Sequence, residues 1–516
     1  MTKLASTALL LALTSAPAAS QTFPTDDPVI RRMWSEGTTD GSQAYPLAQA
    51  LLDSIGPRLM GSEGFDAAAD WVIDRYEAWG ISARREHYGT WLGWRRGHTR
   101  LDLIEPRYRG LEGIMLAYSA GTTGPVEGEV VLFPNLADSL AYERWLADVD
   151  GRFVMVSAPE PTCRPDVNWD ARARPESVER MLEMRDSMRS AWASRFRNTG
   201  SNLGGRLDAS GAAGILTTYW SAGWGVNKVH STDLRSVPML DVSCEDYGLL
   251  FRLAENGQGP HVRLDADSEL LGERPAYNVI ASMRGSELPD EYVLLSAHLD
   301  SWDGASGATD NGTATIMIME AMRILKATFP NPRRTILVGH WGGEEQGLVG
   351  STAFAADNPE TVAGIHIGFN QDNGGWRIEA IRMQGFSEAQ ENVTRWLSSI
   401  PREIADTIQF DSPQREGSSD HTSFTCWGAP VVRLQANYPD YRQYTWHTNR
   451  DTFDKIVFDD LRNNATLTAM LAYLAADDSE PVSRVRQPPP SAPGQPQTWP
   501  PCRPSRRSAT GEQPAA

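Results

Sequence analysis

Five short polar patches in the second half of the chain carry imidazole and carboxylate side chains. In chain order they are residues 297–303 (AHLDSWD), 307–313 (GATDNGT), 341–347 (WGGEEQG), 370–375 (NQDNGG) and 444–452 (YTWHTNRDT). Each patch alone fits an ordinary loop, because an Asp-Asn-Gly stretch is usually a turn and adjacent glutamates usually face solvent. Together they form a more specific pattern, since every patch contains a histidine or a carboxylate and four of them follow a predicted strand.

The residue types in these patches suit a hydrolytic metal site. Imidazole and carboxylate together are the ligand set that zinc takes in such sites. At the end of a strand, residues two apart share a face, so Asp300 can hydrogen-bond the ring nitrogen of His298 that does not face a metal. Asp310 lies in a glycine-rich loop that opens a predicted helix, and such a loop can leave both carboxylate oxygens free to bridge two cations.

The elements that must position these patches alternate between strand and helix. Buried strands are predicted at residues 291–298 and 334–341, where apolar side chains run almost without interruption. A helical pattern over residues 311–329 lies between them, as in the right-handed crossover of a parallel sheet. Ligands of such sheets bind beyond the carboxyl ends of the strands, where the patches fall. Another helix is predicted over residues 65–79, with Gly80 at its carboxyl end. The fold class is therefore α/β, with a mostly parallel central sheet sandwiched by helices.

Segments outside this pattern divide the chain. Residues 1–20 combine a positive start, an apolar stretch and small residues, which is typical of a secretory signal peptide. Residues 121–267 are predicted to form an inserted domain, which interrupts a catalytic domain built from residues 21–120 and 268–482. Residues 483–516 are so rich in proline that a disordered tail is predicted.

Charge and cysteine content narrow the function classes. The 48 basic and 66 acidic side chains give a formal net charge of −18, which argues against a nucleic-acid partner. No apolar run after the signal peptide is long enough to span a membrane, so we expect a secreted or periplasmic protein. Four cysteines are too few for a disulfide scaffold in so long a chain. Cys163 and Cys244 fall in one predicted domain, and the residues leave open whether they form a disulfide or remain buried thiols.

The order of the motifs, His-x-Asp, Asp-Asn-Gly, Glu-Glu, Asp and His, resembles the co-catalytic zinc exopeptidases. That family includes bacterial zinc aminopeptidases and carboxypeptidase Q. Residues 55–62 (IGPRLMGS) look like its N-terminal landmark, and residues 298–308 (HLDSWDGASGA) are especially similar to carboxypeptidase Q. The insert resembles the β-rich protease-associated domain of many members. The resemblance covers roughly residues 44–475 and implies the zinc exopeptidase fold, two zinc ions and peptide substrates.

The resemblance also implies a metal-ligand set. His298, Asp310 and Asp372 would hold one zinc ion. Asp310, Glu345 and His447 would hold the other, with Asp310 as the bridging carboxylate. Two zinc ions placed in this way would activate a shared water molecule and polarise the scissile carbonyl.

Further roles follow for residues beside the ligands. Glu344 would be the general base that takes the proton of the water and returns it to the leaving amine. Asp300 would orient His298 without touching a metal. His421 lies in a polar loop of the catalytic half and is a candidate for the substrate cleft, with a structural hydrogen bond as the alternative. Trp446 could form a wall beside His447 or belong to the core.

The function predicted is a secreted zinc exopeptidase that acts at the terminus of peptides or on dipeptides. The sequence around His447 (HTNRDT) favours an aminopeptidase, which we prefer, whereas residues 298–308 favour a carboxypeptidase Q-like carboxypeptidase or dipeptidase. Two other classes resemble the same fold. One is glutaminyl cyclase, an acyltransferase, and the other is an inactive receptor-like binding protein. The presence of all five ligands and Glu344 counts against the inactive binding protein. The inserted domain and the complete ligands of the second metal site count against glutaminyl cyclase.

Overall fold

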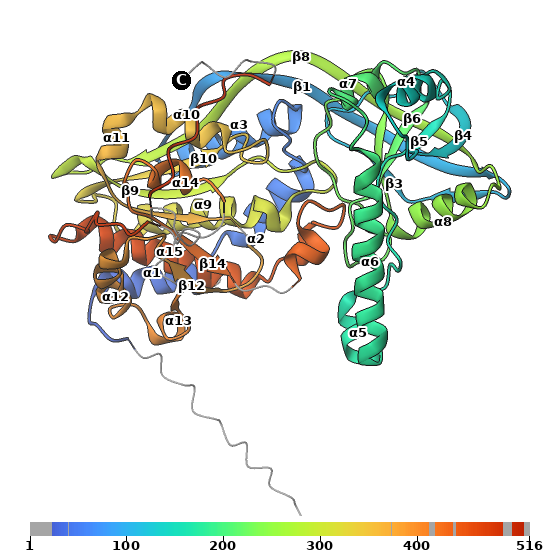
Figure 1. Ribbon diagram of the computed structural model, residues 1–516. Coiled ribbons are helices and arrows are strands. Elements are labelled where there is room, and N and C mark those ends of the chain that lie inside the picture. Colours follow the sequence, from blue (N-terminus) through green and yellow to red (C-terminus); the bar gives the residue numbers. More distant parts are fainter. Residues whose placement is uncertain are drawn as a thin grey trace, which may run out of the picture.

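Two long antiparallel strands, β1 (Ser82–Glu105) and β8 (His261–Met283), run from a larger lobe of the molecule into a smaller one (Figure 1). This computed structural model describes residues 23–39, 41–372, 374–411, 418–436, 440–488 and 498–509. The predicted signal peptide, residues 1–20, lies outside the described residues. Each lobe has a hydrophobic cluster of its own. The lobes are therefore separately packed units that share one pair of strands.

The central sheet of the larger lobe is mostly parallel. Its strands, in spatial order from β8, are β10 (Arg334–Trp341), β9 (Leu288–His298), β11 (Ile365–Gln371), β14 (Val431–Ala436), β12 (Ile378–Arg382) and β13 (Gln409–Asp411). Strands β10, β9, β11 and β14 pair in parallel, whereas β8 joins β10 antiparallel and β12 joins β14 antiparallel. Every residue of β10 and β11 is buried, as expected of strands that are covered on both faces.

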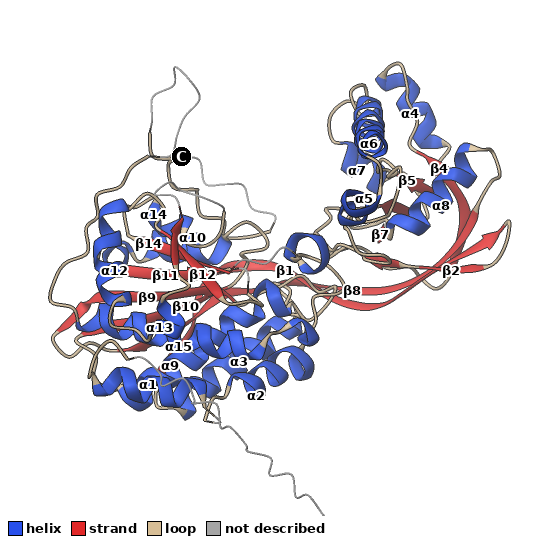
Figure 2. Ribbon diagram, turned by 90° about the horizontal axis from the view of Figure 1, so that it is seen from below, coloured by secondary structure: helices blue, strands red, loops and turns tan. Residues whose placement is uncertain are grey.

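Helices cover the sheet on both sides (Figure 2). One face packs against α1 (Pro28–Thr38), α2 (Ala44–Gln49), α3 (Glu63–Ala78), α9 (Thr313–Thr328) and α15 (Phe458–Asp477). The other face packs against α10 (Val349–Asp357), α11 (Pro359–Ala363) and α14 (Thr422–Thr425). The lobe also contains α12 (Gln390–Leu397) and α13 (Arg402–Ala405), with short helical turns at Ala50–Ile55, Ala308–Gly312, Ser387–Ala389, Tyr441–Thr445 and Phe453–Lys455. The predicted α/β fold with a sandwiched central sheet is confirmed.

Local sequence signals explain where these helices begin and end. Helix α3 starts after Ser62, whose hydroxyl accepts a hydrogen bond from the backbone of Phe65. It ends before Gly80, which adopts a φ of 72° that a glycine accommodates without strain. In α9 nearly every side chain is buried between the sheet and α15. Most of its side chains are therefore apolar, and its buried Glu320 and Arg323 form an ion pair with each other.

The smaller lobe continues the sheet. Its strands are β2 (Arg109–Leu111), β3 (Gly113–Met115), β4 (Val126–Leu132), β5 (Phe153–Met155), β6 (Gly214–Thr217) and β7 (Met239–Val242). Its helices are α4 (Ser139–Ala147), α5 (Asp166–Arg172), α6 (Pro175–Arg195), α7 (Leu203–Asp208) and α8 (Cys244–Glu255). The sequence predicts a β-rich insert, but the described part of this lobe is mixed α/β. The long helix α6 accounts for much of the difference, because it begins with Pro175 at its first position and consists largely of good helix formers.

The extent and identity of the insert stay predictions. The hydrophobic cluster of the smaller lobe includes Leu101 and Met115, which precede the predicted range of 121–267. Its likeness to a protease-associated domain rests on the sequence resemblance alone. Cys163 and Cys244, whose pairing the sequence left open, form a disulfide within this lobe.

The C-terminal segment corrects the prediction of a disordered tail over residues 483–516. Residues 498–509 contain no helix or strand, as their prolines require, yet they lie against the larger lobe. Cys502 forms a disulfide with Cys426, and the ring of Trp499 packs 6.0 Å from that of Phe386. A covalent bond and an aromatic anchor hold the segment in place without regular secondary structure. Residues 489–497 and 510–516 lie outside the described residues.

Among the described helices, none combines the length and apolar character needed to cross a membrane.

Candidate metal centre

The five polar patches converge at the carboxyl-terminal edge of the parallel strands. His298 is the last residue of β9 and pairs with Trp341, the last residue of β10, so the two strands end level with each other. Glu344 and Glu345 follow β10, and Asp372 follows β11 directly. Parallel strands that end together place the residues after them side by side, as the sequence predicts.

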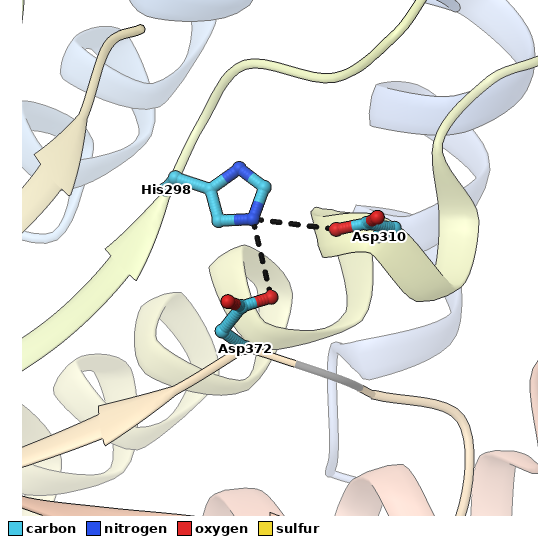
Figure 3. A group of neighbouring side chains, drawn as sticks. All are labelled: His298, Asp310 and Asp372. Carbon is cyan, nitrogen blue, oxygen red and sulfur yellow. Dashed lines mark hydrogen bonds and ion pairs between the residues drawn. The ribbon is translucent and has the colours of Figure 1, made fainter. Parts of the chain in front are cut away.

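The first group of candidate ligands consists of His298, Asp310 and Asp372. Figure 3 shows the imidazole of His298 pointing between the two carboxylates, with its Nε2 atom 3.4 Å from Asp310 Oδ1 and 3.4 Å from Asp372 Oδ1. All three residues are buried, and their potential ligand atoms lie within 4.8 Å of one another. Three such donors from a strand end, a turn and a second strand end can hold one metal ion.

The second group consists of Asp310, Glu345 and His447. His447 Nε2 lies 2.9 Å from Glu345 Oε2 and 3.5 Å from Asp310 Oδ2. Asp310 thus directs one oxygen at each group, which is the arrangement that a bridging carboxylate needs. The buried atoms Asp310 Oδ2 and Glu345 Oε1 have no hydrogen-bond partner among the described residues. Buried carboxylate oxygens without a donor are expected where they face a cation, so the residues present fit a pair of metal ions.

The turn that carries the two glutamates is held by Asp300. Its carboxylate accepts hydrogen bonds from the backbone N–H groups of Glu344 and Glu345, each at 3.2 Å. The sequence predicts instead that this carboxylate orients His298. In the structure the backbone carbonyl of Asp300 makes the hydrogen bond to His298 Nδ1, at 2.9 Å, while the carboxylate oxygen is 3.7 Å away. The two buried peptide N–H groups of the turn need an acceptor, and they take the carboxylate.

Two buried residues fix the loop that presents Asp310. The Asp451 carboxylate accepts hydrogen bonds from the backbone N–H groups of Thr309, at 2.8 Å, and Asp310, at 3.0 Å. Arg58, which is fully buried, donates to the carbonyls of Ser306 at 2.6 Å and Gly307 at 3.0 Å. Sequence reasoning assigned no role to either residue, although Asp451 belongs to the fifth patch and Arg58 to the IGPRLMGS landmark.

Two residues of the smaller lobe contact His447 and help to hold it in place. The backbone N–H of Val229 donates to the carbonyl of His447 at 2.7 Å, and His230 Nδ1 lies 3.3 Å from His447 Nδ1. Burial, with smaller contributions from His447 and Lys228, lowers the pKa of His230 to about 3, so His230 is neutral. It can therefore accept a hydrogen bond from the Nδ1–H group of His447, which leaves His447 Nε2 free to bind a metal. Sequence reasoning missed His230, because nothing local marks it.

The buried carboxylates of the two candidate metal groups need positive charge nearby to be stable in their ionised form. Burial raises the pKa of Glu344 well above its usual range, and Asp372 adds to the effect. Burial does the same for Glu345, together with Asp310. Burial favours the neutral form of His298, but Glu344 and the other surrounding carboxylates outweigh it and raise the pKa of His298. Carboxylates buried together are stable only with compensating cations, and a divalent ion in each group would supply them.

Comparisons with known proteins agree with this geometry. Residues 278–472 match the description "Peptidase family M28". Carboxypeptidase Q of Xenopus laevis is 25% identical over 455 residues, which cover 86% of this chain and 88% of the relative. Human carboxypeptidase Q is 23% identical over 449 residues, with 86% and 87% covered.

Solved structures share the fold. A peptidase M28 precursor from Shewanella amazonensis superposes with a TM-score of 0.67 at 23% identity and covers 90% of this chain and 98% of its own. BSAP, a zinc aminopeptidase from Bacillus subtilis, gives a TM-score of 0.54 at 17% identity, with 86% and 96% covered. Residues 278–472, which contain all five candidate ligands, are similar to peptidase family M28. The predicted membership of the co-catalytic zinc exopeptidases is confirmed, and the protein is a metallo-exopeptidase.

A cavity of about 330 Å³ gives access to the two groups of candidate ligands in this exopeptidase. Its lining includes Asp310, Glu344, Glu345, Asp372 and His447, together with Ser418, Arg433, Tyr441, Arg442, Trp446 and Arg503. Trp446 thus forms part of the wall, as the sequence suggests. His421 does not line this cavity and is completely buried. It lies at the start of α14, whose packing on the sheet encloses its side chain, so the alternative of a structural role fits it better.

Proposed function

We propose that the chain is an exopeptidase with two zinc ions. His298, Asp310 and Asp372 would hold one ion, and Asp310, Glu345 and His447 the other. The observation that carries the proposal is the sharing of Asp310 between two three-residue groups that open into one cavity. Three protein ligands per ion leave coordination positions for water and substrate, as catalytic zinc sites require.

Glu344 is the general base of the proposed mechanism. It lines the cavity beside both groups but belongs to neither. When bound, two zinc ions would lower the pKa of a water molecule at the site and polarise the scissile carbonyl. Glu344 takes a proton from that water and delivers it to the nitrogen of the leaving amine. A carboxylate at this position can both accept and return a proton.

The proposed substrate end is the free N-terminus, so that the enzyme is an aminopeptidase that also splits unblocked dipeptides. The sequence around His447 and the fold shared with zinc aminopeptidases support this choice. A carboxypeptidase Q-like dipeptidase is the second candidate. The coverage of carboxypeptidase Q over 86% of the chain supports it, as do three arginines in the cavity wall, Arg433, Arg442 and Arg503.

A matched peptide panel tests the proposal. Free, N-acetylated and C-amidated di- and tripeptides are incubated with the zinc-loaded enzyme and the products are identified by mass spectrometry. An aminopeptidase loses activity on the acetylated peptides and still cleaves the amides, whereas a carboxypeptidase shows the reverse. Cyclisation of N-terminal glutamine peptides without hydrolysis would identify a glutaminyl cyclase, and no turnover would favour a receptor-like binding protein.

We also propose that the protein acts outside the cytoplasm, in the periplasm or the medium. The two disulfides, Cys163–Cys244 and Cys426–Cys502, support this location, because disulfides persist in oxidising compartments. Fractionation of the producing cells tests it directly.

A further inference from the structure

The C-terminal segment, residues 498–509, is anchored on both sides of Arg503. On one side, Cys502 is bonded to Cys426 and the guanidinium of Arg486 lies 4.3 Å from the ring of Trp499. On the other side, Arg507 makes two hydrogen bonds of 2.6 Å to the carboxylate of Asp357. The backbone between these anchors therefore has a defined path over the larger lobe, although it lies beyond residues 278–472 that match the family.

This path brings Arg503 to the rim of the metal cavity. Arg503 lines the same cavity as the two metal groups, and its Nη2 atom lies 3.4 Å from the hydroxyl of Ser418. It is exposed, so its guanidinium can reach a molecule in the cavity. The segment thus contributes a wall to a site whose other residues come from the strand ends.

Arg503 belongs to a cluster of three cationic side chains in that wall. Arg433 donates a hydrogen bond of 2.8 Å to the backbone carbonyl of Asp372, and the guanidinium of Arg442 lies 4.7 Å from the ring of Trp446. Across the described residues, none of the three forms an ion pair with a carboxylate. Arg96, by contrast, forms an ion pair with Asp303. Guanidinium groups around a cavity that have no carboxylate partner in the protein are suited to bind a carboxylate of the ligand.

We propose that the C-terminal segment completes the substrate site and that Arg503 selects short peptides with a carboxylate beyond the scissile bond. The inference rests on the proposed exopeptidase function and adds the class of substrate to it. The carboxylate can be the α-carboxylate of a dipeptide or an acidic side chain, and both present the same group to a guanidinium. Arg503 binds this group and does not take part in the chemical step. Its replacement should therefore change KM and leave kcat unchanged.

Three peptides and three variants test the proposal in the full-length, zinc-loaded enzyme. The peptides are Leu-Ala, its C-terminal amide, and Leu-Asp amide, which restores a carboxylate on the side chain. The variants are Arg503→Gln, Arg503→Lys and the control Arg506→Gln. Arg506 lies in the same segment, with its guanidinium 4.9 Å from the ring of Trp91, and does not line the cavity.

The wild type should prefer at least one carboxylate peptide over Leu-Ala amide. Arg503→Gln should raise KM for that peptide about fivefold, the effect of losing one exposed charge-assisted hydrogen bond, while its kcat stays unchanged. Arg503→Lys should retain much of the preference, and Arg506→Gln should leave it intact. A chain that ends at residue 497 should lose the preference as Arg503→Gln does.

Two results overturn the inference while the proposed function stands. In the first, the wild type hydrolyses the peptides normally and Arg503→Gln has the same KM values as the wild type. In the second, Arg503→Gln loses the same share of activity on all three peptides, which would indicate a structural role for Arg503. If the zinc-loaded wild type hydrolyses none of the peptides, the proposed function fails and the inference falls with it.

Discussion

Replacing Arg58 by methionine should destabilise the larger lobe and loosen the metal centre together. Arg58 is fully buried beneath the loop that carries Asp310. Its guanidinium donates four hydrogen bonds to backbone carbonyls, at 2.7 Å to Leu299, 3.2 Å to Gly56, 2.6 Å to Ser306 and 3.0 Å to Gly307. Burial lowers its pKa to about 10, against the opposing effect of Asp451 and other carboxylates, so the side chain is charged at neutral pH.

The size of the effect follows from these contacts. Methionine fills a similar volume but leaves the carbonyls of Gly56, Leu299 and Ser306 without this donor, and each such group costs about 1–3 kcal/mol. The Gly307 carbonyl still accepts a hydrogen bond of 2.9 Å from the backbone N–H of Gly312. The losses are not additive, since the loop can shift and water can enter, so we expect a total of about 3–5 kcal/mol. The loss of one positive charge beside the buried carboxylates should also lower the affinity for zinc.

Denaturant unfolding of the zinc-loaded protein, with zinc content measured on the same samples, checks this prediction. Arg84→Met is the control, because Arg84 is exposed and makes an ion pair with Glu86 on the same strand. That change should cost less than about 1 kcal/mol. If Arg58→Met were as stable as the control and kept its zinc, Arg58 would not be what holds the Asp310 loop.

Three further substitutions separate the roles in the site. Glu344→Gln should lower the rate of hydrolysis by at least ~10²–10⁴-fold with normal zinc content, whereas Glu345→Gln should lose zinc as well as activity; the opposite pattern would exchange their roles. His230→Ala removes the acceptor for His447 Nδ1 and should weaken zinc binding ~10–100-fold, measured by competition with a chelator. Unchanged resistance to the chelator would show that the smaller lobe does not position His447.

The metal groups could be predicted from sequence because their ligands follow the strands they belong to. His298 and Asp372 each lie at or directly after the end of a buried apolar run, and the geometry of parallel strands brings such ends together. Asp310 precedes helix α9 and Glu345 follows strand β10, and both elements have clear hydrophobic patterns in the sequence. The family resemblance then assigned each ligand to its ion, which spacing alone does not do.

The contacts that sequence reasoning missed come from distant parts of the chain. His230 and His447 are 217 positions apart, and no local pattern near His230 indicates that the smaller lobe turns back towards the site. The Asp300 carboxylate could bond either His298 or the next turn, and only the three-dimensional path of residues 342–345 decides between them. For the C-terminal segment, proline content correctly excludes helix and strand but says nothing about a disulfide to Cys426.

The central claim, two zinc ions that share Asp310, is tested most directly by elemental analysis of zinc in the purified wild type and in Asp310→Ala. The account predicts two zinc ions per chain in the wild type and nearly none in the variant, because each group would lose one of its three ligands. Loss of about one equivalent in His447→Ala would show that the second group binds separately. Full zinc occupancy in Asp310→Ala would contradict the account.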